Sequence, residues 1–256
     1  CSVSLVFNMS QKNSISVIII ARNEGARIAG CIGSISWADE IIVVDNGSTD
    51  DTVSIAKKLN AKIIEQHGIN FSALREYGAA GASGKWFLYI DADELVTTEL
   101  RKEIEEKITE STSAYYISRK NYYLGHEWPT KDKMIRLIRK DALISWKGKL
   151  HEHPEIRGEI GNLKESLIHN THRTLSEMVE KTNEWSEIEA DLRLRANHPH
   201  MVWWRFFRVM ISAFWRSYIV EGGWKAGMAG WIESIYQMYS MFITYAKLWE
   251  RQQKKS

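Results

Sequence analysis

Three carboxylates stand within four positions directly after an apolar run, in the segment WFLYIDADE at residues 86–94. They belong to Asp91, Asp93 and Glu94. Like charges this close repel one another, and each loses hydration at the edge of a core. A solvated loop would tolerate them, whereas a divalent cation would use them, because hard metal ions prefer oxygen ligands. A D-x-D spacing is common by chance, so other polar segments must decide between the two interpretations.

Two further polar segments also follow apolar, β-branched runs. RNEG at 22–25 follows the run at 16–21, and DNGS at 45–48 follows IIVV at 41–44. Helical patterns separate these runs, including one at 71–82, and this alternation predicts βαβ units with a parallel sheet. In such sheets ligands bind beyond the carboxyl ends of the strands. We therefore expect the three polar segments to converge on one cleft.

The side chains of these segments suit a nucleoside diphosphate bound with a metal ion. Asp45 could accept hydrogen bonds from a ribose or a base, while Asn23 and Glu24 could fix a base edge or brace the loop. A magnesium or manganese ion held by an aspartate typically also binds phosphate oxygens. Neither G-x-x-x-x-G-K-[ST] nor G-x-G-x-x-G follows the first strand, which counts against an ATPase or a dehydrogenase.

Composition limits the function classes further. The net charge of +2 gives no general case for binding nucleic acid. Cys1 and Cys31 do not form a disulfide framework, which favours a reducing compartment. The first residues lack a basic stretch followed by a long apolar run, so we expect no signal peptide. We expect a disordered or appended segment at 1–13, a catalytic domain at 14–198 and a helical extension at 199–256.

The extension differs in composition from the rest of the chain. Six of the eleven tryptophans lie beyond residue 200, where Lys and Arg outnumber Glu by eight to three. Two helices are expected, at 203–220 and 231–249. Arg205, Arg208 and Arg216 interrupt the first of them too often for it to span a membrane. Tryptophan beside arginine favours peripheral membrane contact through 203–249. The alternative is that these helices pack on the catalytic domain or on a second copy, as a homo-oligomer.

A further long helix should begin at Thr174, where Thr174-Leu175-Ser176-Glu177 fits a capping box. Its apolar face would face the core. The expected members of that face are Leu175, Met178, Val179, Thr182, Trp185, Ile188 and Leu192.

Residues 14–145 resemble a known family. SVIIIARNE at 16–24, VVDNGSTDDT at 43–52 and GKWFLYIDADE at 84–94 are similar to successive motifs of family 2 glycosyltransferases. The resemblance implies the GT-A fold, a mostly parallel Rossmann-like sheet flanked by helices, and inverting transfer from a nucleotide sugar. RLIR at 136–139, LHEH at 150–153 and the segment 169–190 are closer to the lipopolysaccharide inner-core β-glucosyltransferases.

The resemblance implies donor-binding roles for five residues. Ala21, Asn23 and Glu24 would line the base pocket, and Asp45 would contact uracil or ribose. Arg75 would approach the nucleotide or its diphosphate, with a surface salt bridge as its alternative.

The acidic segment would hold the reacting end of the donor. Asp91 and Ala92 would address the donor, with Asp91 counted among the catalytic residues, and Asp93 would bind Mn²⁺ or Mg²⁺. His169 could complete the metal shell or contact the diphosphate, although a structural role is more usual for a single histidine. Glu94 would only cap the following turn.

Inversion requires a base for the acceptor hydroxyl, and Glu152 in KLHEH at 149–153 is our choice. Its alternative is a salt bridge with Lys147 or Lys149, and Glu127 and Asp132 are reserve candidates for the base.

The sequence thus predicts a metal-dependent inverting glycosyltransferase at the inner face of the cytoplasmic membrane. It would move a sugar, with glucose from UDP-glucose as first choice, to a membrane-associated glycan such as lipopolysaccharide core. Alternatives are another nucleotide sugar, or a protein or polyprenyl acceptor. A nucleotidyltransferase would need a basic or glycine-rich triphosphate loop, which residues 22–25 do not supply. A catalytically inactive binding protein is a third alternative.

Overall fold

The computed structural model describes residues 13–68, 70–148, 152–171 and 174–255. Chain contacts divide it into two units, one formed by residues up to Arg119 with Lys133–Ile168, the other by Lys120–Asp132 with His169 onward. Almost all of the expected segment 1–13 therefore lies outside the described residues. Contacts do not show which segments fold independently, so the predicted domain boundary near residue 198 stays a prediction.

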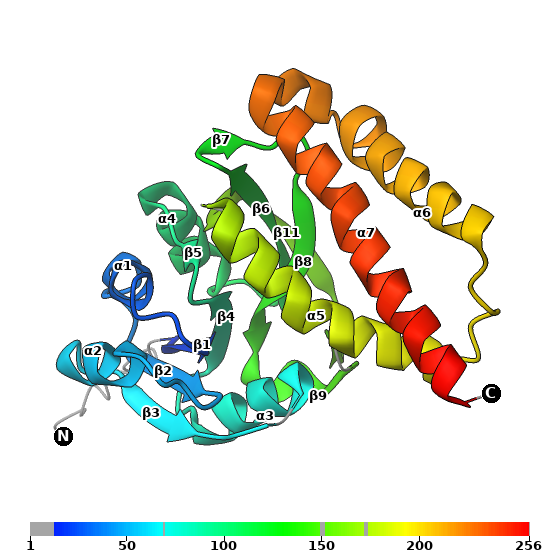
Figure 1. The fold of residues 1–256 in the computed structure, drawn as a ribbon. Helices are drawn as coiled ribbons and strands as arrows, with labels where there is room; N and C mark the ends of the chain where they lie inside the picture. The colour runs from blue at the N-terminus through cyan, green and yellow to red at the C-terminus, as the bar shows by residue number, and fades with distance from the viewer. Residues whose placement is uncertain (1–12, 69, 149–151, 172–173, 256) are drawn as a thin grey trace, which may run out of the picture. The chain divides into compact units, whose positions relative to one another are not determined.

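The first unit is built on a parallel sheet (Figure 1). Its strands are β1 (Ile15–Ala21), β2 (Glu40–Asp45), β3 (Lys62–Glu65) and β4 (Trp86–Asp91), in the order β3-β2-β1-β4. All seven residues of β1 are buried, as expected of a β-branched run covered on both faces. The predicted parallel strands and βαβ alternation are confirmed.

The sheet continues with strands from later in the sequence. β8 (Asp132–Arg139) pairs antiparallel with β4, and β6 (Ala114–Tyr123), β11 (Ile160–Asn170) and β5 (Glu94–Leu95) follow in that order. The short β7 (His126–Glu127) pairs with β6.

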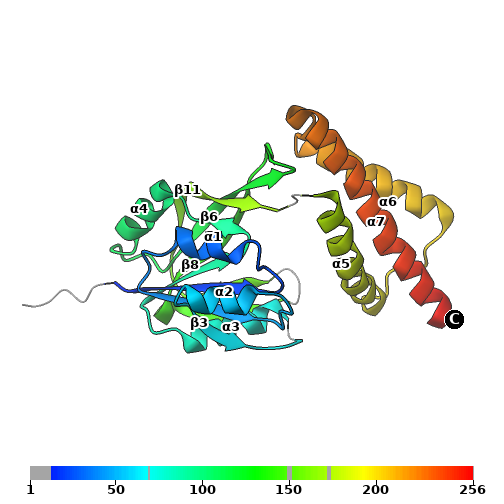
Figure 2. The same ribbon diagram turned by 60° about the vertical axis from the view of Figure 1, so that its left-hand side comes forward.

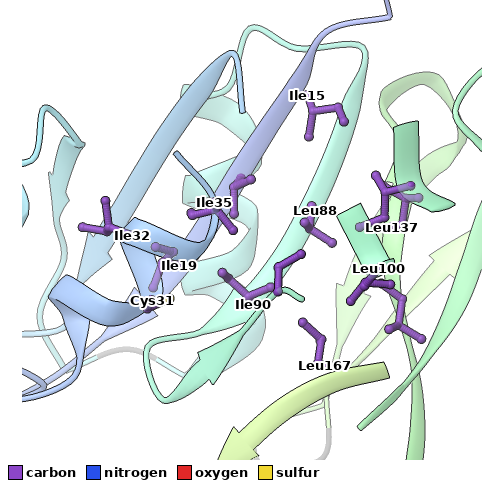
Figure 3. Packing of buried hydrophobic residues seen from close by; sticks show 14 of the residues in the cluster. Ile15, Ile19, Cys31, Ile32, Ile35, Leu88, Ile90, Leu100, Leu137 and Leu167 are labelled. Carbon is purple, nitrogen blue, oxygen red and sulfur yellow. The ribbon is translucent and has the colours of Figure 1, made fainter. Parts of the chain in front are cut away.

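Helices cover both faces of the parallel strands. α1 (Ile28–Ser34), α2 (Thr52–Lys58) and α4 (Thr98–Lys107) contribute to one apolar cluster, part of which is drawn in Figure 3. α3 (Phe71–Gly81) contributes Leu74 to the cluster on the opposite face. Alternate residues of β1 point into the two clusters, because successive side chains of a strand face opposite ways.

A hairpin of β9 (Leu143–Lys147) and β10 (His153–Ile156) lies beside α3. The hydroxyl of Ser72 on α3 donates to the carbonyl of Gly148, and the N–H of Trp146 donates to Glu76 at 3.1 Å. These bonds fix the helix against the hairpin, whose turn carries Glu152.

The second unit holds three long helices, α5 (Leu175–Arg195), α6 (Trp203–Trp215) and α7 (Gly227–Lys255). α7 packs against both of the others (Figure 2). Short helical turns at Arg216–Val220 and Gly223–Ala226 connect α6 to α7. Thr174 caps α5 by accepting from the N–H of Glu177 at 3.2 Å, so the predicted helix start is confirmed. Within the described residues no helix is long and apolar enough to cross a membrane.

The predicted buried face of α5 is confirmed at Met178 and Thr182 and is wrong at Leu175, Val179 and Ile188. The residues of α5 that are buried are Met178, Thr182, Ser186 and Ala190, whereas Leu175, Val179 and Ile188 are exposed. The reason is the close packing of α5 on α7, which favours small and hydroxyl side chains: Tyr236 of α7 reaches across to the Thr182 hydroxyl and to the carbonyl of Met178.

Candidate active site

The loops after β1 and β2 are joined by hydrogen bonds. The N–H of Asn23 donates to Ser48 Oγ at 2.9 Å, and Asn23 Oδ1 accepts from the N–H of Thr49 at 2.8 Å. The N–H of Glu24 donates to Thr52 Oγ1 at 2.8 Å. Asn23 adopts a left-handed conformation, with φ of 56°, which asparagine tolerates better than most residues. The structure thus brings the first two polar segments into one framework at the strand ends.

Asp45 shapes the second of these loops. Its Oδ2 accepts from the N–H groups of Gly47 and Ser48, each at 3.0 Å, and its Oδ1 accepts from the Ser48 hydroxyl. Asp45 is buried, and Ala21, its partner across β1 and β2, is buried as well. Its contact with uracil or ribose stays a prediction, as does the place of Ala21 in a base pocket.

The acidic segment lies at the same edge of the sheet, because Asp91 pairs with Ile20 in the register of β1 and β4. Asp91 is surrounded by guanidinium groups. Its carboxylate lies 2.7 Å from Nη2 of Arg136, 3.1 Å from Nη2 of Arg75 and 3.8 Å from Nη1 of Arg119. Burial alone would raise the pKa of Asp91, but Arg136 and Arg75 outweigh it and hold that pKa well below its usual range.

Glu94 belongs to the same cluster. It accepts from the N–H of Asp91 at 2.8 Å, as a turn cap would, but its carboxylate also lies 3.1 Å from Arg119 and 3.3 Å from Arg136. Its side chain is fully buried, so the expectation that it only caps the turn is wrong. Burial opposes the charge of Arg136, yet Asp91 and Glu94 raise the pKa of that guanidinium.

These ion pairs show how the negative charges of the segment WFLYIDADE are balanced. The sequence alone suggested that a metal and a diphosphate balance all three carboxylates. The structure instead pairs Asp91 and Glu94 with arginines of the protein itself. Asp93 is half-buried in the turn between β4 and β5, and its role in binding a metal ion stays a prediction.

Arg75 connects Asp91 to the predicted base. Its Nε and Nη2 both donate to Oε1 of Glu152, at 3.0 and 2.8 Å, while Nη2 also donates to Asp91. The guanidinium lies over the rings of Trp146 and Tyr89, with its carbon 4.9 and 5.7 Å from their centroids. Arg75 is only 3% exposed, so the alternative of a surface salt bridge is excluded.

Of the two lysines considered as alternative partners of Glu152, Lys147 pairs with Glu155 at 2.7 Å, and Lys149 lies outside the described residues. The Glu152 side chain is 14% exposed, so it is held by Arg75 yet remains in reach of solvent.

The remaining candidates belong to the second unit. Glu127 is exposed and accepts from the Tyr122 hydroxyl at 3.2 Å. Asn121 donates to Asp132 at 3.0 Å and lies 2.7 Å, through Oδ1, from Nδ1 of His169. With the Asn121 amide oriented in this way, Nδ1 of His169 donates to Asn121 Oδ1. No group of three metal-binding side chains occurs within the described ranges, and the metal role of His169 stays a prediction.

Sequence reasoning did not find Arg119 and Arg136 as site residues. The signal available was the position of Arg136 within the apolar strand pattern MIRLIR, because a charged residue in a buried strand must be paired. Its partners could not be named, since they lie on another strand more than forty residues earlier.

The comparisons with known proteins identify the family of this chain. The family profile "Glycosyl transferase family 2" matches residues 16–169. The lipopolysaccharide core biosynthesis glycosyltransferase LpsC of Rhizobium meliloti is 27% identical, over 97% of this chain and 96% of that protein. An uncharacterized glycosyltransferase of Rickettsia prowazekii is 30% identical, over 91% of this chain and 86% of that protein.

Among solved structures, glucosyl-3-phosphoglycerate synthase from Mycobacterium tuberculosis, in complex with Mn²⁺, UDP and glucosyl-3-phosphoglycerate, is 21% identical with a TM-score of 0.47. The alignment covers 73% of this chain and 81% of that one. This likeness is too low to carry an argument about ligands. The family match, with the mostly parallel sheet and its flanking helices, confirms the predicted GT-A fold. The chain therefore belongs to glycosyl transferase family 2 and is a nucleotide-sugar glycosyltransferase.

Proposed function

We propose that the chain is an inverting, metal-dependent glycosyltransferase that moves a sugar, glucose in the first instance, from a UDP-sugar to a membrane-associated glycan. The observation that carries this proposal is the link from Asp91 through the buried Arg75 to Glu152 at the carboxyl end of the sheet. Asp91, the proposed carboxylate for the donor, and Glu152, the proposed carboxylate for the acceptor hydroxyl, both accept from Arg75, which supports the proposal. The name of the relative LpsC supports lipopolysaccharide core as the acceptor.

The donor site fits a diphosphate with Mn²⁺ or Mg²⁺. Asp93 would hold the ion together with diphosphate oxygens, because such ions are commonly bound by one or two carboxylates, phosphate and water. The ion would stabilise negative charge on the departing UDP. Arg75 Nη1 is buried and has no hydrogen-bond partner among the described residues, so it could donate to a diphosphate oxygen.

Glu152 is the proposed base. Arg75 binds only Oε1, which leaves Oε2 to accept the proton of the acceptor hydroxyl. The acceptor oxygen would attack the anomeric carbon from the face opposite UDP. The new glycosidic bond forms as the bond from that carbon to the phosphate oxygen breaks, with its electron pair leaving on UDP. Arg75 would hold the carboxylate in the orientation this requires.

The location follows from the acceptor. We place the protein at the inner face of the cytoplasmic membrane, in peripheral contact through residues 203–249. A lipid-linked glycan would then be presented at the surface on which the enzyme sits.

Calorimetric binding of UDP, GDP and ATP, each with Mn²⁺ and with EDTA, tests the donor site. UDP should bind the wild type in the presence of metal, and binding should fall at least tenfold with EDTA or in Asp93→Ala, because a metal–diphosphate contact would be lost. A preference for ATP would favour nucleotidyl transfer. UDP binding that ignores both the metal and the substitution would contradict the proposed donor site.

A further inference from the structure

One face of α6 is apolar and exposed to solvent. Four of its side chains recur every fourth position, which places them in a stripe along the helix. They are Trp203, Phe207, Ile211 and Trp215, exposed by 75%, 60%, 61% and 59%. We call this stripe the α6 apolar face. The opposite side of α6 packs on α7, with Val209 buried and Phe206 lying 5.8 Å from Phe242 between ring centroids.

The charged residues of the α6 segment, defined here as residues 199–220, are all arginines. Residues 199–220 contain Arg205, Arg208 and Arg216 and no acidic residue. The guanidinium carbons of Arg205 and Arg208 lie 5.3 and 5.6 Å from the Trp204 ring centroid, within cation–π range. The nearest acid along the chain, Glu221, pairs with Arg216 at 2.9 Å. The face is thus bordered by cations that lie against an aromatic side chain.

An apolar groove opens next to the face, within the same unit. It has a volume of about 540 Å³ and is lined by residues of the α6 segment, such as Met201, Phe206 and Met210, and by Phe242 and Trp249 of α7. Its lining side chains are all apolar, whereas a site for a nucleotide or a glycan needs several placed polar groups. A hydrocarbon chain meets these walls without leaving a polar group unpaired.

We infer that the α6 apolar face docks on the surface of an anionic lipid bilayer, with the groove receiving one acyl chain. Tryptophan and phenylalanine beside arginine are the side chains that place a helix in the headgroup region. This inference rests on the proposed peripheral membrane contact and assigns it to one helix face. A second copy fits less well, because a two-fold contact through α6 would bring the arginines of both copies together without an acid in 199–220 to pair them.

Cosedimentation with vesicles tests the docking. The wild type should bind phosphatidylcholine vesicles that contain phosphatidylglycerol and bind pure phosphatidylcholine at least tenfold more weakly. Ile211→Ser should reduce binding to the anionic vesicles about tenfold, the effect expected for removing one buried aliphatic side chain. Ile144→Ser is the matched control, since Ile144 is an isoleucine of similar exposure, 53%, on β9. Circular dichroism verifies that both variants are folded.

Lipids brominated on the acyl chain test the groove. They should quench part of the tryptophan fluorescence, and Trp249→Phe should remove a part of that quenching whereas Trp37→Phe should not, because Trp37 lies on the first unit. Equal vesicle binding by Ile211→Ser and Ile144→Ser, or equal binding to neutral and anionic vesicles, would overturn the inference. A dimer that dissociates only in Ile211→Ser would assign the face to a second copy. UDP calorimetry on the same proteins shows whether the donor site still binds UDP when vesicle binding is lost, so the two proposals are tested separately.

Discussion

Among single residues, Glu152 and its partner Arg75 determine whether the proposed chemistry is available. Glu152→Gln keeps the shape of the side chain but removes the proton acceptor, so we expect kcat to fall by about 10²- to 10⁴-fold with UDP affinity nearly unchanged. Steady-state kinetics together with calorimetry measure the two quantities. Glu155→Gln is the control, because Glu155 lies in the same hairpin but pairs with Lys147 at the surface. Loss of activity in both variants alike would remove Glu152 from the role of base.

Arg136 is expected to affect the stability of the fold. Arg136→Gln leaves Asp91 and Glu94 with one guanidinium fewer in a buried site, and we expect a loss of about 3 kcal/mol or more at neutral pH. Arg139→Gln removes a pair with the exposed Asp141 and should cost at most about 1 kcal/mol. Urea unfolding of both variants measures the difference.

The same substitution should alter the response to acid. The pKa of Asp91 is lower in the folded chain, so its ionisation stabilises the fold above the unfolded pKa of about 4 and is lost as the pH falls further. In Arg136→Gln this contribution is already reduced, so the stability gap between wild type and variant should narrow as the pH drops below about 4. A gap that stays constant with pH would mean that Arg136 acts through packing alone.

At the scale of elements, the contact of α3 with β1 sets the position of Arg75. A Cβ on Gly78 would lie 2.4 Å from Cγ2 of Ile18, so Gly78→Ala must displace α3 or the strand. We expect it to destabilise the protein by about 1–3 kcal/mol and to lower kcat, because Arg75 lies one turn earlier on the same helix. Gly33→Ala on α1 is the control: no atom lies within 4 Å of its added Cβ, and it should be neutral or stabilising by up to about 1 kcal/mol. Equal stability of the two variants would contradict this account.

The elements also show how far the sequence alone could lead. Runs such as SVIIIA and IIVV identified the parallel strands, because β-branched residues buried on both faces leave a continuous apolar pattern. The strand-end rule then located the three polar segments at one edge of the sheet. The buried face of α5 could not be predicted fully in this way. Its contact with α7 includes Ser186 and Ala190, and a pattern of large apolar residues does not mark such small side chains as buried. The arginine cluster was missed because ion pairs between distant strands leave no local pattern.

On the scale of the whole molecule, the net charge of +2 conceals an uneven distribution. Residues 199–220 alone carry three arginines and no acid, whereas the acidic segment at the strand ends lies in the other unit. Raising the salt concentration should therefore weaken vesicle binding more than UDP binding. Raising the ionic strength from about 0.01 to 0.15 M shortens the screening length from about 30 to 8 Å, so binding to anionic vesicles should weaken severalfold.

UDP binding in the presence of metal should change much less over the same range, because buried pairs such as Arg136 with Asp91 are poorly screened. Vesicle cosedimentation and calorimetry at matched salt concentrations test this. Parallel loss of both properties would show that exposed charges control the donor site as well.

The shared guanidinium of Arg75 has a thermodynamic consequence. It bonds Asp91 and Glu152 at once, so a ligand that draws it toward the donor must alter its hold on Glu152. Donor and acceptor binding are then linked, and linkage is reciprocal: whatever factor UDP contributes to the affinity for acceptor, acceptor contributes to the affinity for UDP. The carboxylate of Glu152 would then be released from Arg75 only when the sugar nucleotide is bound.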